Sequence, residues 1–190
     1  MSKYDTIIGY INTGLKSGNF ASNRFQRGKF YGITELLKLE EGTMPCVIAD
    51  NGQATKISID DNYPFQLYHR ILGIEGEEDE AGYGQDIDVI ERCSIQMVII
   101  FNRELIRLKK EDIVSGVFSS LILGISKANM ASLNINECNI SYGNFNLNYE
   151  DVYNAEYNLG EYLLKPQTVM IALPYEIEVK YRKGCIQICN

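Results

Sequence analysis

The feature that most constrains the fold is a long β-branched run that leads directly into an amphipathic helix. The run CSIQMVIIFNR begins at Cys93, and its centre, MVIIF, is almost continuously apolar. A strand of this composition must be covered on both faces. A charged bend, ELIRLKKED, separates it from IVSGVFSSLIL, which ends at Leu123. The sequence therefore predicts a buried strand over 87–102, followed by a helix that lies on the sheet.

The predicted helix has an apolar side and a side of small polar residues. The apolar positions, four residues apart, are Ile113, Val117 and Leu121, and the serines opposite are Ser115, Ser119 and Ser120. Glu111 and Asp112 lie in the first turn, where the helix dipole favours carboxylates. We expect the serine side, with Gly116, to face outward. Such a side either lets another element approach the helix closely or faces solvent.

Further elements follow from periodicity. Apolar residues spaced as on one helical stripe predict an amphipathic helix that begins near Tyr4 and ends near 14–18. The Asn51-Gly52 pair between 45–49 and 54–59 predicts a tight hairpin, since Asn-Gly supplies positive φ angles. Alternation of apolar and charged residues predicts a strand with one buried face over 168–183. Shorter strands are expected at 33–39, where a helix is the alternative, at 65–72, where an extended crossing segment is the alternative, and at 137–142.

Together these elements predict one α+β domain over residues 1–190, which suits the length of the chain. Its sheet is expected to be mixed and mostly antiparallel, with an N-terminal helix and one helix packed on it. Three irregular segments are expected, at about 16–32, 75–88 and 129–165. In the Asn/Tyr-rich third segment, Tyr149, Tyr153 and Tyr157 are four apart. Such a stripe faces a core or binds a partner.

The first irregular segment, an arm over 16–32, combines basic and aromatic residues without any period. Its basic residues are Lys16, Arg24, Arg27 and Lys29, and its aromatic residues are Phe20, Phe25, Phe30 and Tyr31. Two interpretations stay open. The aromatic side chains pack back onto their own domain, or the arm packs on a neighbouring subunit.

The second irregular segment, GIEGEEDEAGYGQDID, is dense in carboxylates. They are Glu75, Glu77, Glu78, Asp79, Glu80, Asp86 and Asp88. Like charges at this density repel one another and favour a solvated loop between two strands. A negatively charged lining and a cation site are the alternatives. The spacing of acidic residues in an EF-hand is absent, which argues against specific calcium binding.

Composition narrows the classes of function. The net charge of −7 and pI near 4.8 argue against a protein that grips nucleic acid by neutralising phosphates. Five cysteines without a C-x-x-C pair favour free thiols in a reducing compartment. No secretory signal pattern and no apolar run long enough for a membrane span are found, so we expect a soluble protein made in the cytoplasm.

The sequence carries no recognisable catalytic motif. The single histidine, His69, has no second histidine nearby for a zinc site, and we expect it to be structural. No nucleophile elbow and no phosphate-binding glycine loop appear. A carboxylate pair for glycoside hydrolysis stays an open alternative, although no pair stands out. We therefore expect no catalytic residues, no metal, no cofactor and no enzyme activity.

The order of elements resembles the tail-terminator and head-to-tail joining proteins of tailed bacteriophages, which form rings in the neck and tail. The segments that carry the resemblance are RCSIQMVIIFNR, KKEDIVSGVFSSLIL and PYEIEVKYRKG, about a third of the chain. The resemblance implies a structural virion protein that forms a homo-oligomeric ring of six or twelve subunits. The ring would contact other neck or tail proteins and surround a channel through which the genome DNA passes without specific binding. No membrane is implied.

Within this resemblance, two segments acquire expected roles. The arm would contact an adjacent subunit, with candidate residues Phe20, Arg24, Phe25, Arg27, Phe30 and Tyr31. The acidic segment would face the channel or the next ring, with candidate residues Glu75, Glu77, Glu78, Asp79 and Glu80. The protein would be made in the cytoplasm of the bacterial host and reside in the virion. A non-viral soluble binding or scaffolding module is the alternative, and an enzyme with an unrecognised acidic site is a third possibility.

Overall fold

The computed structural model of the protein describes residues 2–17, 27–40, 42–49, 51–60, 62–79, 88–106, 109–126, 130–142 and 167–182. The helical elements are α1 (Lys3–Ser17), α2 (Lys110–Ser126) and the short 3-10 helix η3 (Met130–Leu133). The strands are β1 (Lys29–Ile33), β2 (Glu35–Leu39), β3 (Gly42–Ile48), β4 (Ala54–Lys56), β5 (Phe65–Asp79), β6 (Asp88–Asn102), β7 (Glu137–Tyr142) and β8 (Thr168–Arg182).

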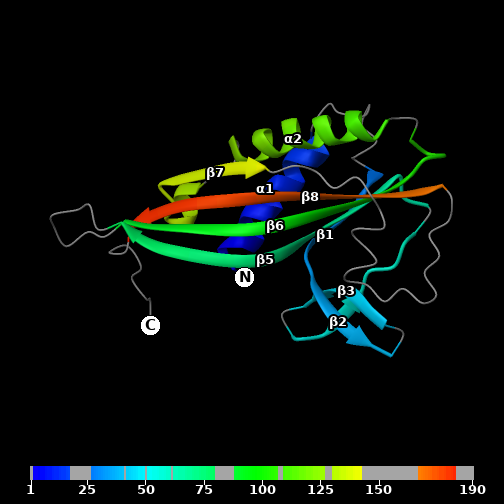
Figure 1. Cartoon of the computed structure of the whole chain (residues 1–190), viewed down its shortest axis with the longest axis horizontal. Coiled ribbons are helices and arrows are strands. Elements are labelled where there is room, and N and C mark those ends of the chain that lie inside the picture. Colours follow the sequence, from blue (N-terminus) through cyan, green and yellow to red (C-terminus); the bar gives the residue numbers. More distant parts are fainter. Residues whose placement is uncertain are drawn as a thin grey trace.

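The strands form a main sheet and a small one. The main sheet has the order β1-β5-β6-β8-β7, and the small sheet has the order β2-β3-β4. Only the pairing of β1 with β5 is parallel, and all other pairs are antiparallel. The predicted fold class is therefore confirmed: an α+β fold with a mixed, mostly antiparallel sheet and an N-terminal helix. The three longest strands, β5, β6 and β8, run side by side along the long axis (Figure 1).

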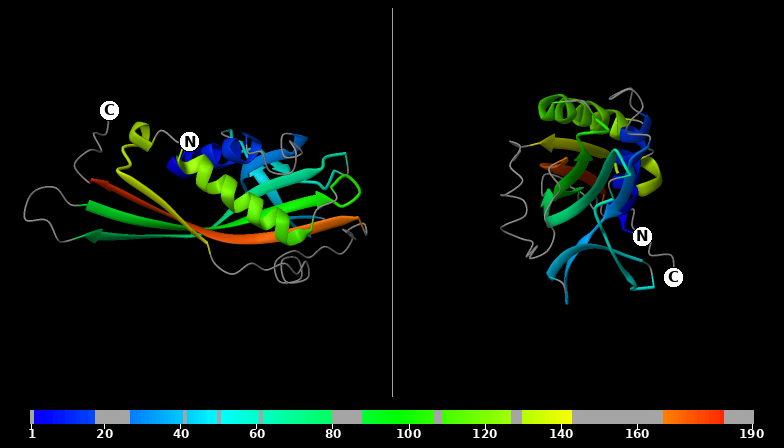
Figure 2. Two further views of the ribbon diagram at one scale, coloured as in Figure 1. Left: turned by 90° about the horizontal axis from the view of Figure 1, so that it is seen from above. Right: turned by 90° about the vertical axis from the view of Figure 1, so that its right-hand side faces the viewer.

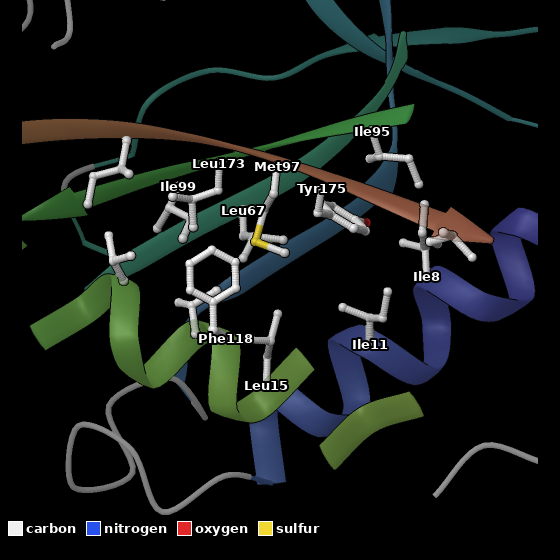
Figure 3. Close-up of a cluster of buried hydrophobic side chains, with 14 of the residues drawn as sticks. Ile8, Ile11, Leu15, Leu67, Ile95, Met97, Ile99, Phe118, Leu173 and Tyr175 are labelled. Atoms are coloured by element: carbon white, nitrogen blue, oxygen red, sulfur yellow. The ribbon is translucent and has the colours of Figure 1, made fainter. Parts of the chain in front are cut away.

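Both long helices lie on one face of the main sheet (Figures 1 and 2). Their apolar side chains pack against alternate residues of β5, β6 and β8 in the main core, and Figure 3 shows Ile11, Leu15 and Phe118 of the helices facing Leu67 and Met97 of the sheet. The residues of α1 that the spacing predicted to face inward, including Ile7 and Ile11, are fully buried. This face of the sheet is called the helix face below.

The opposite face of the main sheet, called the outer face below, is covered only in part. Near the chain's entry into β5, Tyr68, Val98 and Met170 form a second core with side chains of the small sheet, such as Leu36 and Val47. Side chains of the small sheet and of the segment that follows it, among them Ile57 and Ile59, thus cover this half of the outer face. Because both faces are covered there, the centre of β6 is apolar at every position, as the MVIIF run predicted.

The two helices meet at a pair of glycines. A Cβ atom at Gly14 of α1 would lie 2.5 Å from the Cα atom of Gly124 in α2 and 2.8 Å from the carbonyl oxygen of Ser120. The expectation that Gly116 and Ser120 face outward is wrong, since both are buried. Ser120 is only 4% exposed, and its hydroxyl donates to the carbonyl oxygen of Gly116. The small residues of α2 therefore serve the contact between the helices, whereas Ser115 and Ser119 are exposed as predicted.

The predicted hairpin is confirmed. β3 and β4 pair antiparallel, and the amide of Ala49 donates to the carbonyl of Gln53 across the turn. Gly52 has a φ of 79°, a left-handed conformation that glycine adopts without strain. The Asn-Gly pair therefore located the turn, and its glycine supplies a positive φ angle there.

Two irregular segments are shorter than predicted. Residues 16–17 of the expected arm belong to α1, and 29–33 form β1, which pairs parallel with β5 and buries part of Phe30. The expected acidic loop over 75–88 begins later, because β5 continues to Asp79 and β6 begins at Asp88. Pairing with Arg92 and its neighbours on β6 offsets the repulsion between these carboxylates. The predicted tyrosine stripe at 149–157 lies outside the described residues.

Among the described helices, none is both long and apolar enough to cross a bilayer. The described cysteines, Cys46, Cys93 and Cys138, are free thiols, as expected. The strands predicted at 33–39, 65–72, 87–102, 137–142 and 168–183 are present as β2, β5, β6, β7 and β8.

The helix contact generates a prediction with an internal control. Gly14→Ala places a methyl group against backbone atoms of α2, so we expect the free energy of unfolding in urea to fall by about 1–3 kcal/mol. Gly9 lies on the same helix, and a Cβ there meets no atom within 4 Å. Gly9→Ala is therefore expected to raise the stability by about 0.5–1 kcal/mol. Equal effects of the two substitutions would contradict the close contact.

Candidate interaction surface on the outer face of the sheet

The half of the outer face that the small sheet leaves uncovered is lined by polar and charged residues from four strands. By strand, its central residues are Arg70, Gly73, Glu75 and Glu77 of β5; Ile90, Arg92 and Ser94 of β6; Glu176, Glu178 and Lys180 of β8; and Glu137, Asn139 and Ser141 of β7. Directly paired residues of adjacent strands point to the same side. The alternation predicted for 168–183 thus places the charged residues of β8 on this surface.

The charges on this surface are organised around Arg92. Its guanidinium lies 2.8 Å from a carboxylate oxygen of Glu77 and 2.9 Å from one of Glu178, and these hydrogen bonds raise the pKa of Arg92. Lys180 lies 3.5 Å from Asp88. The side chains are a third to a half exposed, so the network adds little to stability and leaves the carboxylates accessible.

A row of small residues crosses the sheet and hollows this surface. Gly73, Ser94, Glu176 and Ser141 stand side by side on β5, β6, β8 and β7. Three of the four have short side chains or none. The result is an open depression of about 430 Å³, with Leu72 at one end, Tyr142 at the other and Pro174 beside it. It is a shallow groove across the strands and does not enclose a ligand.

A buried hydrogen-bonded chain lies on the other side of the sheet. The Nε2 atom of His69 is 2.9 Å from Oδ1 of Asn12, and its Nδ1 atom is 3.0 Å from the hydroxyl of Tyr175. An amide oxygen only accepts, so Nε2 carries the proton and the tyrosine hydroxyl donates to Nδ1. Burial lowers the pKa of His69 to about 3. The histidine is fully buried and joins α1, β5 and β8, which accords with the structural role expected for it.

A second polar cluster fixes the start of α1 to the sheet. The carboxylate of Glu91 on β6 accepts from Nζ of Lys3 at 2.8 Å, from the hydroxyl of Tyr4, and from the hydroxyl of Tyr181 at 3.3 Å. Burial alone would raise the pKa of Glu91, but these hydrogen bonds outweigh it and hold the pKa below its usual value. The cluster therefore keeps a partly buried carboxylate ionised.

The described thiols are in apolar surroundings. Burial raises the pKa of Cys93 to about 11, with Glu91 adding to the shift, and burial alone does the same for Cys138. Thiols of this kind are poorly nucleophilic at neutral pH. Across the described parts of the chain, no group of three or more His, Cys, Asp or Glu side chains is placed to hold a metal ion.

The described residues of the predicted arm contact their own domain. Phe30 packs against the main core, and Nζ of Lys16 lies 4.8 Å from the centre of its ring. Tyr31 packs against the second core, and its hydroxyl accepts from Nε2 of Gln66 at 3.1 Å. Arg27 is exposed. Phe20, Arg24 and Phe25 lie outside the described residues, so the proposed subunit contact stays a prediction for them.

The structure likewise describes the side chains of some acidic candidates and not of others. Glu75 and Glu77 are exposed on the outer face of β5. Glu78 and Asp79 have backbone positions in β5, but their side chains lie outside the description, as does all of Glu80. The structure therefore places Glu75 and Glu77 together with Glu176 and Glu178 of β8 on one surface, an association that the sequence analysis did not predict.

Sequence reasoning also missed Asn12, the partner of His69, and Glu91, the carboxylate at the centre of the second polar cluster. Each is a polar residue within a stripe or run that faces the core. Glu91 lies on the helix face of β6, between apolar positions. A charged residue in phase with buried positions signals a paired charge, and this signal was available in the sequence.

The comparisons with known proteins return no match: no protein-family model fits the chain, and no curated protein is similar to it.

The Glu91 cluster predicts a dependence of stability on pH. Because its pKa is lowered in the folded state, Glu91 stabilises the fold above the ordinary glutamate pKa of about 4.3, and this contribution is lost as the pH falls through the lower folded value. Glu91→Gln is expected to lower the free energy of unfolding at pH 7 by about 1–2 kcal/mol. The difference from wild type should shrink in acid. A difference that is constant from neutral to acid pH would contradict the assignment.

The His69 chain predicts a fixed tautomer. We expect nitrogen NMR of the single histidine to show neutral imidazole with the proton on Nε2 between about pH 8 and pH 5, since its folded pKa is about 3. The unfolded histidine takes up a proton below about pH 6.5, so this group makes the fold less stable as the pH falls. Tyr175→Phe removes the donor to Nδ1 and is expected to cost about 1–3 kcal/mol. A protonated histidine at pH 5 in the folded wild type would refute this prediction.

Proposed function

We propose that this protein is a structural component that works by assembling with other protein chains, as a ring subunit in the neck or tail of a tailed bacteriophage. In this proposal no bond of a substrate is broken. The protein contributes one segment of a ring around the channel that passes the genome. The alternative, a soluble binding or scaffolding module outside a virion, uses the same surfaces for a different partner.

The observation that carries the proposal is the placement of partly exposed apolar side chains on the two outer strands of the main sheet, beyond the small sheet. Leu72 and Ile74 of β5 are each 51% exposed, and Tyr142 of β7, whose ring stacks on Phe118 of α2, is 49% exposed. The two strands lie on opposite margins of the main sheet and at the same position along the strand direction. Their segments Ile71–Glu77 and Tyr142–Glu137 align with each other through the registers of β6 and β8. Exposed apolar side chains beside open strand edges favour contacts with other chains.

The segments that carry the resemblance to ring proteins also support the proposal. They correspond to β6, α2 and β8. The two strands pair over their full length, and residues of α2 share the main core with them. The resemblance therefore concerns one contiguous structural unit, which is the unit a shared fold would preserve.

The charge of the outer face is compatible with a channel lining. The carboxylates of this face, among them Glu75, Glu77, Glu176 and Glu178, outnumber its cations Arg70, Arg92 and Lys180, within a chain of net charge −7. A negatively charged wall repels the phosphate backbone, so DNA passes without being held.

The proposal is tested by measuring the mass of the purified full chain by light scattering from micromolar to millimolar concentration, with electron microscopy of the same samples. We expect closed rings of one multiplicity, alone or after mixing with neck and tail proteins of a phage that encodes the chain. A strict monomer under all these conditions would refute the ring. A stable complex with a single cellular protein, without rings, would favour the binding module.

A further inference from the structure

Within the described part of the chain, the outer half of β5 forms an edge of the main sheet. β1 pairs with β5 only over Gln66–His69, and no described strand pairs with the same edge from Arg70 to Asp79. In Figure 1 this half of β5 forms the lower margin of the sheet. The backbone N–H and C=O groups that an edge strand turns away from its sheet can pair with a strand of another chain. The exposed side chains of Leu72 and Ile74 lie on this edge.

The charges along this edge are ordered from one end to the other. On the outer face, Arg70 stands at the inner end, and Glu75 and Glu77 stand at the outer end. When two identical strands pair antiparallel, one is reversed relative to the other. Arg70 of each copy then meets Glu77 of the other, with Glu75 diagonal to it. Opposite charges on directly opposed residues stabilise a strand pair.

The apolar residues fit the same register. β5 has a bulge between Ile71 and Gly73, where Leu72 is the extra residue. With Ile74 of one copy opposite Ile74 of the other, the bulges of the two strands are placed symmetrically. Ile71 then meets Gly76, and Gly73 meets Glu75. The two exposed Ile74 side chains cover each other on the helix face.

Charge also decides against pairing of β5 with the other open edge, β7. At the height at which the two edges align, Glu137 of β7 would stand opposite Glu77 of β5. Like charges directly opposed destabilise a strand pair. The pairing of β5 with β5 replaces that repulsion with two symmetric attractions.

We propose that two copies of this protein associate through antiparallel pairing of their β5 edges over Arg70–Glu77, about a two-fold axis at Ile74. This contact closes after two copies. It is therefore separate from the contacts that would build a ring, and it goes beyond the proposed function: in a ring it would join subunits of two stacked rings, and without a ring it gives a dimer.

A cysteine at the axis tests the geometry. In a background with Cys138, Cys185 and Cys189 changed to serine, Ile74→Cys places two thiols within cross-strand distance. Mild oxidation should link most of the protein into covalent dimers. The matched control is Ile122→Cys, a 55% exposed position on α2 far from the edge, which should give several-fold less dimer. Equal yields from the two positions would overturn the proposal.

Charge exchange tests the register. In Arg70→Glu both cross-strand pairs become repulsive, and the same holds for Glu77→Lys, so each variant alone should dimerise about tenfold more weakly than wild type. In a mixture of the two variants, a heterodimer has two attractive pairs, and its affinity should return toward that of wild type. Glu137→Lys on β7 is the control and should leave dimerisation unchanged.

The outcomes separate this inference from the ring. If wild type is monomeric up to millimolar concentration in sedimentation, or if mixing the two variants restores nothing, the β5 contact is refuted. If wild type forms rings or dimers that Arg70→Glu leaves unchanged, assembly uses another surface and the β5 contact is again refuted, while the proposed function stands. Thermal melting of each variant confirms that the monomer remains folded.

Discussion

The antiparallel pairing of β6 with β8 holds the rest of the structure in place. The two strands are matched residue for residue from Asp88 with Arg182 to Asn102 with Thr168, without a bulge. Every other strand of the main sheet joins this pair from one side or the other, and both helices pack on its face. Because the two strands are far apart in sequence, their pairing closes a long loop and lowers the conformational entropy of the chain. The burial of apolar side chains must offset this loss. The side chains of Ile99, Ile171 and Leu173, all fully buried, provide that burial.

The division of the sheet into a covered half and an uncovered half gives rise to the candidate interaction surface. The helix face is apolar along most of its length, whereas the outer face is apolar only beneath the small sheet. Beyond the small sheet the same strands carry Arg92, Glu178 and Lys180. A single strand therefore changes from two-sided burial to one-sided burial along its length. Among the described strands, β5 and β7 border the exposed half with one side unpaired, and such edges are where a sheet meets other chains.

The sequence predicted the elements better than their surroundings. Strands such as β6 and β8 have strong local signals, namely continuous apolar character and strict alternation, so their positions were predicted closely. The extent of β5 was not, because Glu75 and Glu77 read as a solvated loop until Arg92 is placed beside them by pairing that no local pattern encodes. The same holds for Ser120, whose burial depends on the approach of Gly14 from a helix about a hundred residues earlier. The surface itself depends on which distant strands become neighbours, and the local patterns of a single sequence do not give that order.

The extra residue at Leu72 has a consequence for which side of the sheet is charged. Up to Ile71, odd-numbered residues of β5 point toward the helices; from Gly73 onward, even-numbered residues do. The insertion thus acts as a phase shift in the pleat. If Leu72 instead occupied an ordinary place in the pleat, strict alternation would turn the carboxylates of Glu75 and Glu77 toward the side occupied by α1, away from Arg92. The bulge therefore keeps the acidic end of the strand on the open side of the molecule, and deleting Leu72 would remove the bulge while leaving that arrangement of the carboxylates unchanged.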